Sequence, residues 1–365
     1  MKITIEQRDL IKALQHISKL IKANVQMPIL GCVVMDIKPE VISFWASDSI
    51  SVIRVDKPIR CDGEDRIAVA ISSFMEYCQQ LSSGDVILTI NDGSVQVSQG
   101  SSKATFPLSN INDYPDVLET PKEYSLHISQ DNFDLLLKHM LISVSIDDSR
   151  PILTGILLRP QSTGKMTAVG TDGYRLSVYD FEYQGDLDRD VVIPGKIVAT
   201  FLKGSVIDVV DIGLDGQRNQ IWLHSDDLYV GVRIIQGDFP PFERILPTSE
   251  LSKVDVGRDE LLQAVKQMAV FAKYNANIVR VDVGASLKLS THASATGEGD
   301  SNLDVEFSGE KLAVAFNYRY LQDYLGIMPD GVVEIVFNGP LAPVKFVMQE
   351  IGNFVHIIMP VKLQE

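Results

Sequence analysis

Apolar positions along the chain repeat one arrangement three times. An apolar run leads into a short amphipathic segment at residues 67–79, 190–203 and 312–325. The residues that end these runs, Ser72, Pro194 and Asn317, are 122 and 123 positions apart. Alternation of apolar residues predicts strands, and a spacing of three or four predicts helices. The pattern therefore predicts a strand followed by a short helix at three equivalent places.

Each third of the chain also begins with a longer helical pattern. Its apolar positions are Leu10, Leu14, Ile17 and Ile21, then Phe133, Leu137, Met140 and Leu141, then Leu261, Val265, Met268 and Ala269. Ser129 is a candidate N-cap of the second helix. Two similar segments, 27–31 (MPILG) and 150–155 (RPILTG), follow the first two helices, and we expect both to be strands.

Late in each third, two alternating apolar runs flank a turn. The turns contain Gly93, Gly216 and Gly339, each preceded by Asp or Asn, and both steps are 123 residues. Asn-Gly and Asp-Gly pairs supply the positive φ angles of hairpin turns. A repeat of this length is a whole domain. The sequence predicts an α+β fold of three repeated domains with antiparallel sheets and two helices each, at residues 1–122, 123–248 and 249–365.

Composition narrows the class of protein. A chain of 365 residues with 45% hydrophobic residues suits two or three globular domains. No apolar run approaches the roughly 20 residues of a membrane span, and the N-terminus lacks a signal-peptide core, so we expect a cytoplasmic protein without membrane contact. Cys32, Cys61 and Cys78 are widely spaced, which favours reduced thiols. The six histidines lack zinc-site spacing, so neither metal nor cofactor is expected.

The negative charge is unevenly distributed. The net charge is −15, yet the six helical segments together carry +4, which leaves −19 for the rest. Mildly basic helices beside acidic sheets would allow weak attraction to a polyanion, because distant acidic groups are screened. The alternative is that these helical charges are only solvated. Lys196 and Lys203 are candidate contacts to a nucleic-acid backbone.

Catalytic motifs are not supported by the residues. The segment 162–165 (STGK) resembles the end of a phosphate-binding loop, but Arg159 stands where the first glycine is needed and Met166 replaces the Ser or Thr. No G-x-S-x-G motif occurs. The sequence therefore predicts no catalytic residues.

Five segments, in this order, resemble the bacterial DNA polymerase III β subunits, the sliding-clamp family. They are 150–155, 170–180 (GTDGYRLSVYD), 237–247 (GDFPPFERILP), 317–325 (NYRYLQDYL) and 356–363 (HIIMPVKL). The resemblance covers essentially the whole chain. It implies a head-to-tail homodimer that forms a six-domain ring around duplex DNA, with helices inside and sheets outside. It also implies a non-catalytic role, with the replicative polymerase catalytic subunit, the clamp loader, translesion polymerases and mismatch-repair proteins as partners.

The resemblance also implies three sets of site residues. A partner-peptide pocket would comprise Leu153, Thr171, Gly173, Tyr174, Arg175, Leu176, Pro240, Ile245, Ile357, Met359, Pro360 and Val361. The DNA-facing residues would be Lys12, Lys19, Lys22, Arg150, Lys196, Lys203, Lys266 and Lys273. The dimer interface would join Lys103, Phe106 and Leu108 to Val270, Phe271, Glu298 and Asp300 of a second copy.

The chain departs from the family pattern at several positions. Asn24 and Gln26 stand where basic or small polar residues are common, and Lys362 replaces a commoner arginine. Asp147 and Asp148 precede Arg150, and Gln364 and Glu365 extend past the usual terminal leucine. These changes leave the DNA contacts and the partner preference of the pocket open.

Three functions follow from these patterns. The first is a processivity clamp. The second is a repeat-built enzyme with an active site between domains. The third is a peptide-binding scaffold that acts without DNA.

Overall fold

The computed structural model describes residues 1–21, 27–48, 50–61, 63–115, 120–121, 124–202, 209–215, 219–291 and 297–362. Its contacts divide the chain into two compact units. Unit 1 comprises Met1–Gln130, Gln184–Asp186 and Ile197–Ile234, and unit 2 comprises Asp131–Tyr183, Leu187–Lys196 and Ile235–Glu365. The predicted border at 122–123 lies outside the described residues, so the three-domain borders stay a prediction.

Six α-helices occur within the described residues, two for each predicted repeat. They are α1 (Gln7–Ser18), α2 (Ile71–Gln79), α3 (Gln130–Met140), α4 (Gly195–Leu202), α5 (Arg258–Ala272) and α6 (Tyr318–Ile327). The predicted apolar faces are buried, except that Ala269 in the last turn of α5 and Ile21 and Leu141, which follow the ends of α1 and α3, are half-buried. Helix α3 begins directly after Ser129. The helical periodicity in the sequence is therefore confirmed.

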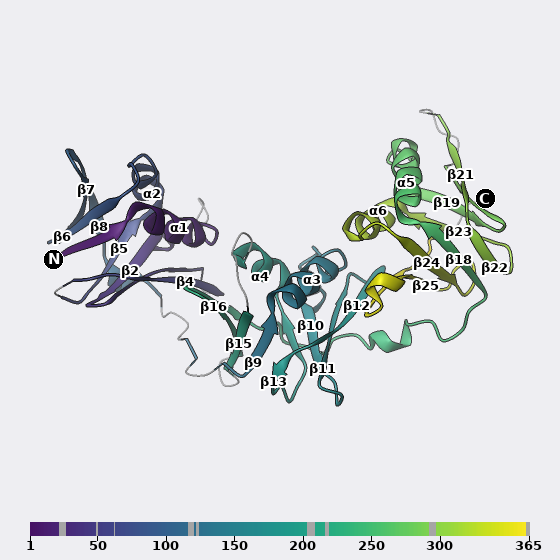
Figure 1. The fold of residues 1–365 in the computed structure, drawn as a ribbon, viewed down its shortest axis with the longest axis horizontal. Coiled ribbons are helices and arrows are strands. Elements are labelled where there is room, and N and C mark those ends of the chain that lie inside the picture. The colour runs from purple at the N-terminus through teal and green to yellow at the C-terminus, as the bar shows by residue number, and fades with distance from the viewer. Residues whose placement is uncertain are drawn as a thin grey trace. The chain divides into compact units, whose positions relative to one another are not determined.

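Unit 1 contains a 13-stranded sheet. Its strands in spatial order are β1 (Lys2–Glu6), β6 (Asp85–Asn91), β7 (Ser94–Gln99), β8 (Ser102–Ser109), β5 (Asp65–Ala70), β2 (Cys32–Lys38), β3 (Val41–Ser47), β4 (Ser51–Pro58), β17 (Leu228–Arg233), β16 (Gln220–Ser225), β15 (Val209–Asp215), β9 (Leu126–Ser129) and β13 (Gln184–Gly185). Helices α1 and α2 lie side by side, and α1 packs on β3 and β4 (Figure 1). Trp45 and Trp222 are buried in one apolar core cluster with Val34 and Val52.

Unit 2 contains a nine-stranded and a four-stranded sheet. The larger sheet runs β14 (Val191–Ile193), β10 (Ile156–Pro160), β11 (Lys165–Thr171), β12 (Arg175–Glu182), β26 (Phe354–Ile358), β25 (Val344–Met348), β24 (Val332–Phe337), β18 (Ser252–Gly257) and β22 (Glu306–Gly309). The smaller sheet runs β21 (Asp300–Asp304), β20 (Ser286–Ser290), β19 (Ile278–Val283) and β23 (Leu312–Asn317). Helices α5 and α6 lie side by side and contact both sheets (Figure 1).

Strand pairing is antiparallel at every ladder within the described residues. The three predicted hairpins are β6–β7, β15–β16 and β24–β25. In the first, Asn91 pairs with Ser94, so Asp92 and Gly93 form a two-residue turn in which Gly93 has φ +71°. A side chain at that φ would be strained, which explains the glycine. The α+β prediction with antiparallel sheets is confirmed.

The expected strands at 27–31 and 150–155 are wrong. Both segments form short 3-10 helices, η1 (Pro28–Gly31) and η3 (Pro151–Thr154), and the strands β2 and β10 begin only after them. Each helix has its proline at the first position, where the fixed φ suits a helix and the missing N–H costs nothing. A strand would have lost a ladder hydrogen bond there. The other 3-10 helices are η2 (Ile111–Asp113), η4 (Phe242–Arg244) and η5 (Gln349–Ile351).

Two ladders join strands that lie far apart in the sequence. In unit 1, β4 pairs with β17, and in unit 2, β12 pairs with β26. Strands β8 and β21 are among those that keep an open side within the described residues. Strand β8 pairs with β7 from Ser102 to Pro107 but with β5 only at Leu108 and Ser109, and β21 is an end strand of its sheet. No helix among the described residues is both long enough and apolar enough to cross a membrane.

Candidate functional site

The β12–β26 ladder of unit 2 supplies the floor of the predicted pocket. Leu176 pairs with Ile357, and both side chains are buried. They belong to one apolar cluster with Val192 and Phe242, against which the half-buried Ile245 packs. Strand alternation brings Leu176 and Ile357 to one face because they stand directly opposite each other. The structure thus brings together three of the predicted pocket residues from three distant segments.

The segment after β26 lies beside this floor. Met359, Pro360 and Val361 are half-buried, and Met359 donates its backbone N–H to the carbonyl of Tyr174 at 2.9 Å. The N–H of Val361 donates to the carbonyl of Ala315 at 2.8 Å. These bonds hold the segment at the surface, where its side chains remain accessible. Pro240 is half-buried ahead of η4, and Leu153 is buried in η3.

The loop between β11 and β12 forms a rim beside Met359. The hydroxyl of Thr171 donates to the carbonyl of Arg175 at 2.7 Å and accepts the N–H of Gly173 at 3.1 Å. One carboxylate oxygen of Asp172 accepts the N–H groups of Tyr174 and Arg175 at 2.9 and 3.0 Å. Gly173 has φ +92°, which favours glycine. The side chain of Tyr174 is 60% exposed, so it is available to a ligand.

The opposite face of the same ladder carries buried polar groups. Ser177 pairs with His356, and the Ser177 hydroxyl lies 3.0 Å from His356 Nδ1 and 2.7 Å from the Ser143 hydroxyl. His356 stacks on Tyr324 with ring centroids 4.9 Å apart. Burial, then the charges of Arg175 and His139, lowers the pKa of His356 to about 3. This imidazole is therefore neutral near pH 7 and acts as a core residue.

A second imidazole lies in the same interior. His139 stacks on Phe354 with ring centroids 4.1 Å apart, and neither of its nitrogens has a hydrogen-bond partner within the described part of the chain. Burial, then the charge of Lys138, lowers the pKa of His139 to about 4. Among the described residues, no group of three or more His, Cys, Asp or Glu side chains is arranged to hold a metal ion.

The predicted DNA-facing residues differ in their surroundings. Lys12 and Lys266 are exposed on α1 and α5, and Lys273 follows α5 with its amine 4.8 Å from the centre of the Tyr274 ring. The Lys19 amine lies 3.4 Å from His16 Nδ1. The Lys196 amine donates to the carbonyl of Ser145 at 2.9 Å, and burial lowers its pKa. Lys22 and Lys203 lie outside the described residues.

Arg150 lies closer to the pocket rim than its predicted role suggests. One guanidinium nitrogen donates to the carbonyl of Asp172 at 3.4 Å, and a side chain at Gly173 would lie 3.5 Å from the same group. Arg150 is nevertheless exposed. The structure therefore places it beside the rim loop, and its role in DNA contact stays a prediction.

The predicted interface residues lie on β8, on β21 and on segments near β21. Lys103 is exposed on β8, and Phe106 is half-buried with its ring 5.3 Å from that of Phe74. Leu108 is half-buried at the end of β8. Val270 is 54% exposed on α5. In the same unit as Val270, Phe271 packs against the backbone of Gly297 and Gly299, Glu298 is exposed, and Asp300 lies 3.5 Å from Lys288.

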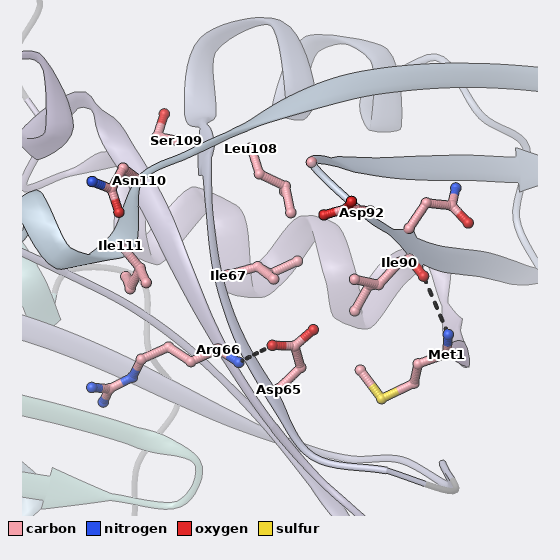
Figure 2. A pocket seen from close by; sticks show the side chains of 12 residues that line it. Met1, Asp65, Arg66, Ile67, Ile90, Asp92, Leu108, Ser109, Asn110 and Ile111 are labelled. Carbon is pink, nitrogen blue, oxygen red and sulfur yellow. Dashed lines mark hydrogen bonds between the residues drawn. The ribbon is translucent and has the colours of Figure 1, made fainter.

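Unit 1 also contains a hollow that the sequence did not predict. Its volume is about 440 Å³, and it lies between β5, the β6–β7 turn and the end of β8 (Figure 2). Ile67, Ile90 and Leu108 line it together with the carboxylates of Asp65 and Asp92. The Asp65 carboxylate accepts the backbone N–H of Arg66 at 2.8 Å (Figure 2). Because Leu108 belongs to both, the hollow adjoins the predicted interface.

Sequence models of one family match the chain from end to end. Those described as DNA polymerase III beta subunit N-terminal, central and C-terminal domain match residues 1–119, 127–241 and 243–362. The chain belongs to the DNA polymerase III β subunit family.

Relatives of this family are similar over their full length. The beta sliding clamps of Vibrio cholerae serotype O1 and Chlamydia pneumoniae are each 25% identical, with 100% of both chains covered. The crystal structure of the DNA polymerase beta subunit of Streptococcus pyogenes is 21% identical, covers 100% of both chains and has a TM-score of 0.94. The three-domain clamp fold is therefore established.

Membership in the β subunit family decides the class of protein. Sliding clamps are non-catalytic, so the chain is not a repeat-built enzyme with an active site between domains.

Some residues that contact the predicted pocket residues were not named from the sequence. Asp323 and Tyr320 of α6 contact Arg175, and Phe242 of η4 lies in the floor cluster. Phe242 stands within the segment 237–247 that carried the family resemblance, so its environment could have drawn attention. Asp323 and Tyr320 stand within the resembling segment 317–325, but nothing in that segment indicated their contact with Arg175, which is 148 positions from Asp323.

Proposed function

We propose that the chain forms a homodimeric ring that encircles duplex DNA and keeps the replicative polymerase on its template. The observation that carries this proposal is how equivalent strands of the three repeats are paired. Strands β4, β12 and β21 begin at residues 51, 175 and 300, and β8, β17 and β26 begin at 102, 228 and 354. The steps are 124 to 126 residues, close to the 123-residue repeat. Each set therefore holds the same strand of three domains.

Pairing between the two sets leaves one strand of each unused. Strand β4 pairs with β17 and β12 pairs with β26, so β21 and β8 remain. A second copy supplies the missing partner to each, because its β8 and β21 are equally open. Two copies joined head to tail then make two such ladders and close a ring.

The side chains at the open strands suit this pairing. Lys103 on β8 and Glu298 and Asp300 at β21 carry opposite charges. Phe106 and Leu108 on one side, and Val270 on the other, supply apolar contacts. Opposite charge fixes the register and rejects wrong partners, while the apolar groups contribute affinity.

Ring closure explains how an acidic protein holds DNA. A closed ring retains duplex DNA by topology, so its contacts to the phosphate backbone can stay weak, sequence-independent and salt-sensitive. The basic balance of the helices supports this, with Lys12, Lys19, Lys22, Arg150, Lys196, Lys203, Lys266 and Lys273 as the proposed contacts.

The pocket over the β12–β26 ladder would recruit partner proteins in the cytoplasm. An apolar floor with a polar rim suits a short peptide anchored by Leu and Phe side chains. Proposed partners are the replicative polymerase catalytic subunit, the clamp loader, translesion polymerases and mismatch-repair proteins. Membrane contact is not part of the proposal.

The sharpest test is topological. The protein is loaded onto nicked circular DNA by a clamp loader, and the circle is then cut once. A ring slides off the new ends, so DNA-bound protein should disappear after the cut and persist on the uncut circle. Retention on the linear DNA would contradict encirclement.

A peptide-binding scaffold that acts without DNA remains the second candidate. The pocket favours it because all of its residues lie in unit 2, so that peptide binding itself needs no ring. The mass in solution distinguishes the two functions. A dimer at micromolar concentration supports the clamp, and a monomer supports the scaffold.

A further inference from the structure

The guanidinium of Arg175 lies between two carboxylates at the pocket rim. Its Nε donates to Asp172 at 3.1 Å, and one terminal nitrogen donates to Asp323 of α6 at 2.6 Å. The same group lies over the ring of Tyr320, 4.5 Å from its centre. The Arg175 side chain is only 12% exposed, against 46% for Asp323. Because the Arg175 guanidinium is largely shielded from water, its attraction to the Asp323 carboxylate is stronger than between two fully exposed groups.

Asp172 links this guanidinium to the shape of the rim. The oxygen of Asp172 that does not bind the Arg175 guanidinium accepts the backbone N–H groups of Tyr174 and Arg175. The carbonyl of Tyr174 in turn accepts the N–H of Met359. One continuous set of bonds therefore runs from α6 through Arg175 and Asp172 to the segment that carries Met359.

An arginine is required for this arrangement. Its planar fork presents separate N–H groups to the two carboxylates and a flat face to the Tyr320 ring. A lysine amine is a single point charge and cannot reproduce these three contacts together. The Arg175 guanidinium sets the direction in which Asp172 approaches it, and Asp323 holds the guanidinium in place.

We propose that Asp323 is a positioning residue for the peptide pocket. It holds Arg175 against Asp172 and so keeps the 171–175 loop in the shape that receives a peptide with Leu and Phe anchors. Asp323 acts through Arg175, and the proposal assigns it no contact with the peptide. This inference rests on the proposed peptide-binding function and adds α6 to the residues that determine affinity.

The test compares the full-length protein with Asp323→Asn. A fluorescein-labelled peptide with Leu and Phe anchors is titrated by anisotropy, and amide hydrogen exchange is followed at residues 171–175. Because the Asp323 carboxylate is half-exposed, its ion pair with Arg175 should contribute only moderately to peptide affinity. We therefore expect this affinity to fall about three- to tenfold. Exchange at Tyr174 and Arg175 should accelerate, while the dimer mass stays unchanged.

Two matched variants separate positioning from a general loss of charge. Asp330→Asn removes an exposed carboxylate on the turn after α6, which accepts the backbone N–H of Gly331. It should leave affinity and exchange at the wild-type level. Asp323→Glu restores the carboxylate and should recover affinity to within about twofold.

The outcomes distinguish the inference from the function on which it rests. If the wild-type protein binds the peptide and Asp323→Asn binds equally well with unchanged exchange, the positioning role is wrong and the pocket stands. If the wild-type protein does not bind the peptide, the pocket assignment fails, and unchanged loop exchange in Asp323→Asn then also overturns the positioning role.

Discussion

Strands β12 and β21 occupy equivalent places in two repeats, yet they are paired differently. Strand β12 is paired on both sides, and Leu176, Tyr179 and Phe181 along it are buried. Strand β21 has one open side, and along its length only Ser301 and Leu303 are half-buried. An open edge that carried apolar side chains would pair indiscriminately with other chains.

The difference shows how one repeated strand can serve two kinds of junction. Where the partner strand lies on the same chain, the ladder is buried and stabilises the fold. Where the proposed partner lies on a second copy, exposed charges such as Asp300 and Asp304 keep the strand soluble until it pairs.

The largest effect is expected at a junction that is closed within the chain. Val230 lies in β17 opposite Ile53 of β4 and Leu223 of β16. Val230→Pro removes an N–H from a strand paired on both sides, and it should lower the free energy of unfolding by about 3 kcal/mol or more. Urea denaturation measures this. A variant as stable as the wild type would show that the ladder does not support unit 1.

The closed junction in unit 2 should also be sensitive to acid. The ordinary imidazole pKa is 6.5, but burial lowers it to about 4 at His139 and about 3 at His356. Below pH 6.5 the unfolded chain therefore binds protons that the folded chain does not, and the free energy of unfolding falls as the pH drops toward 4. We expect a loss of the order of 2 kcal/mol for each histidine.

His139→Phe isolates one of these two contributions. The phenyl ring can keep the stacking on Phe354, and no hydrogen bond is lost within the described residues. The free energy of unfolding, measured by urea denaturation between pH 7 and 4.5, should depend less steeply on pH than in the wild type. An unchanged slope would exclude His139 as a source of the acid sensitivity.

A smaller effect is expected at the open strand β8. Leu108 donates its N–H to Gly93, so alternation along the strand turns the N–H of Thr105 to the open side. Thr105→Pro removes that donor from the proposed ladder. The dimer dissociation constant should rise about tenfold, because each interface would lose one backbone hydrogen bond. Stability of unit 1 should not change.

Sedimentation equilibrium over a dilution series measures the effect, with Thr105→Val as the control that keeps the N–H. If Thr105→Pro dimerises like the control, β8 is not the interface strand. If Thr105→Pro unfolds the protein, β8 stabilises the fold of unit 1 itself, as the strands paired on both sides do.

The smallest effect is expected in the pocket that the closed β12–β26 junction supports. Met359→Ala removes a half-buried side chain beside Ile357 and should weaken partner-peptide binding by about 1 kcal/mol, or roughly fivefold, without changing the dimer mass. Anisotropy titration measures it. Val332→Ala, at a 50% exposed position on β24, is the control. Equal affinity in Met359→Ala and this control would remove Met359 from the pocket.

Local patterns predicted much of the fold because their causes are local. The spacing of Leu10, Leu14 and Ile17 follows from the turn of a helix, and the Asp92-Gly93 turn follows from the φ that glycine allows. The error at 28–31 had a local cause too. Apolar β-forming residues suggested a strand, and the position of Pro28 at the start of a helical turn outweighed them.

The residues of the candidate site were harder to predict from local sequence patterns. Leu176 and Ile357 were named through the family resemblance, and nothing in their own segments indicated that they pair. Asp323 lies in the resembling segment 317–325, but its role was missed, because an ion pair depends on two side chains that meet only after folding.

The sequence by itself determined the threefold repeat, the helices, the hairpins and the uneven charge, since each depends on residues close together in the chain. Only the tertiary structure decided that β4 pairs with β17 and β12 with β26, while β8 and β21 keep an open side. The reason is physical. Backbone N–H and C=O groups are the same in every strand, so the pairing of distant strands depends on which edges the packed chain brings together.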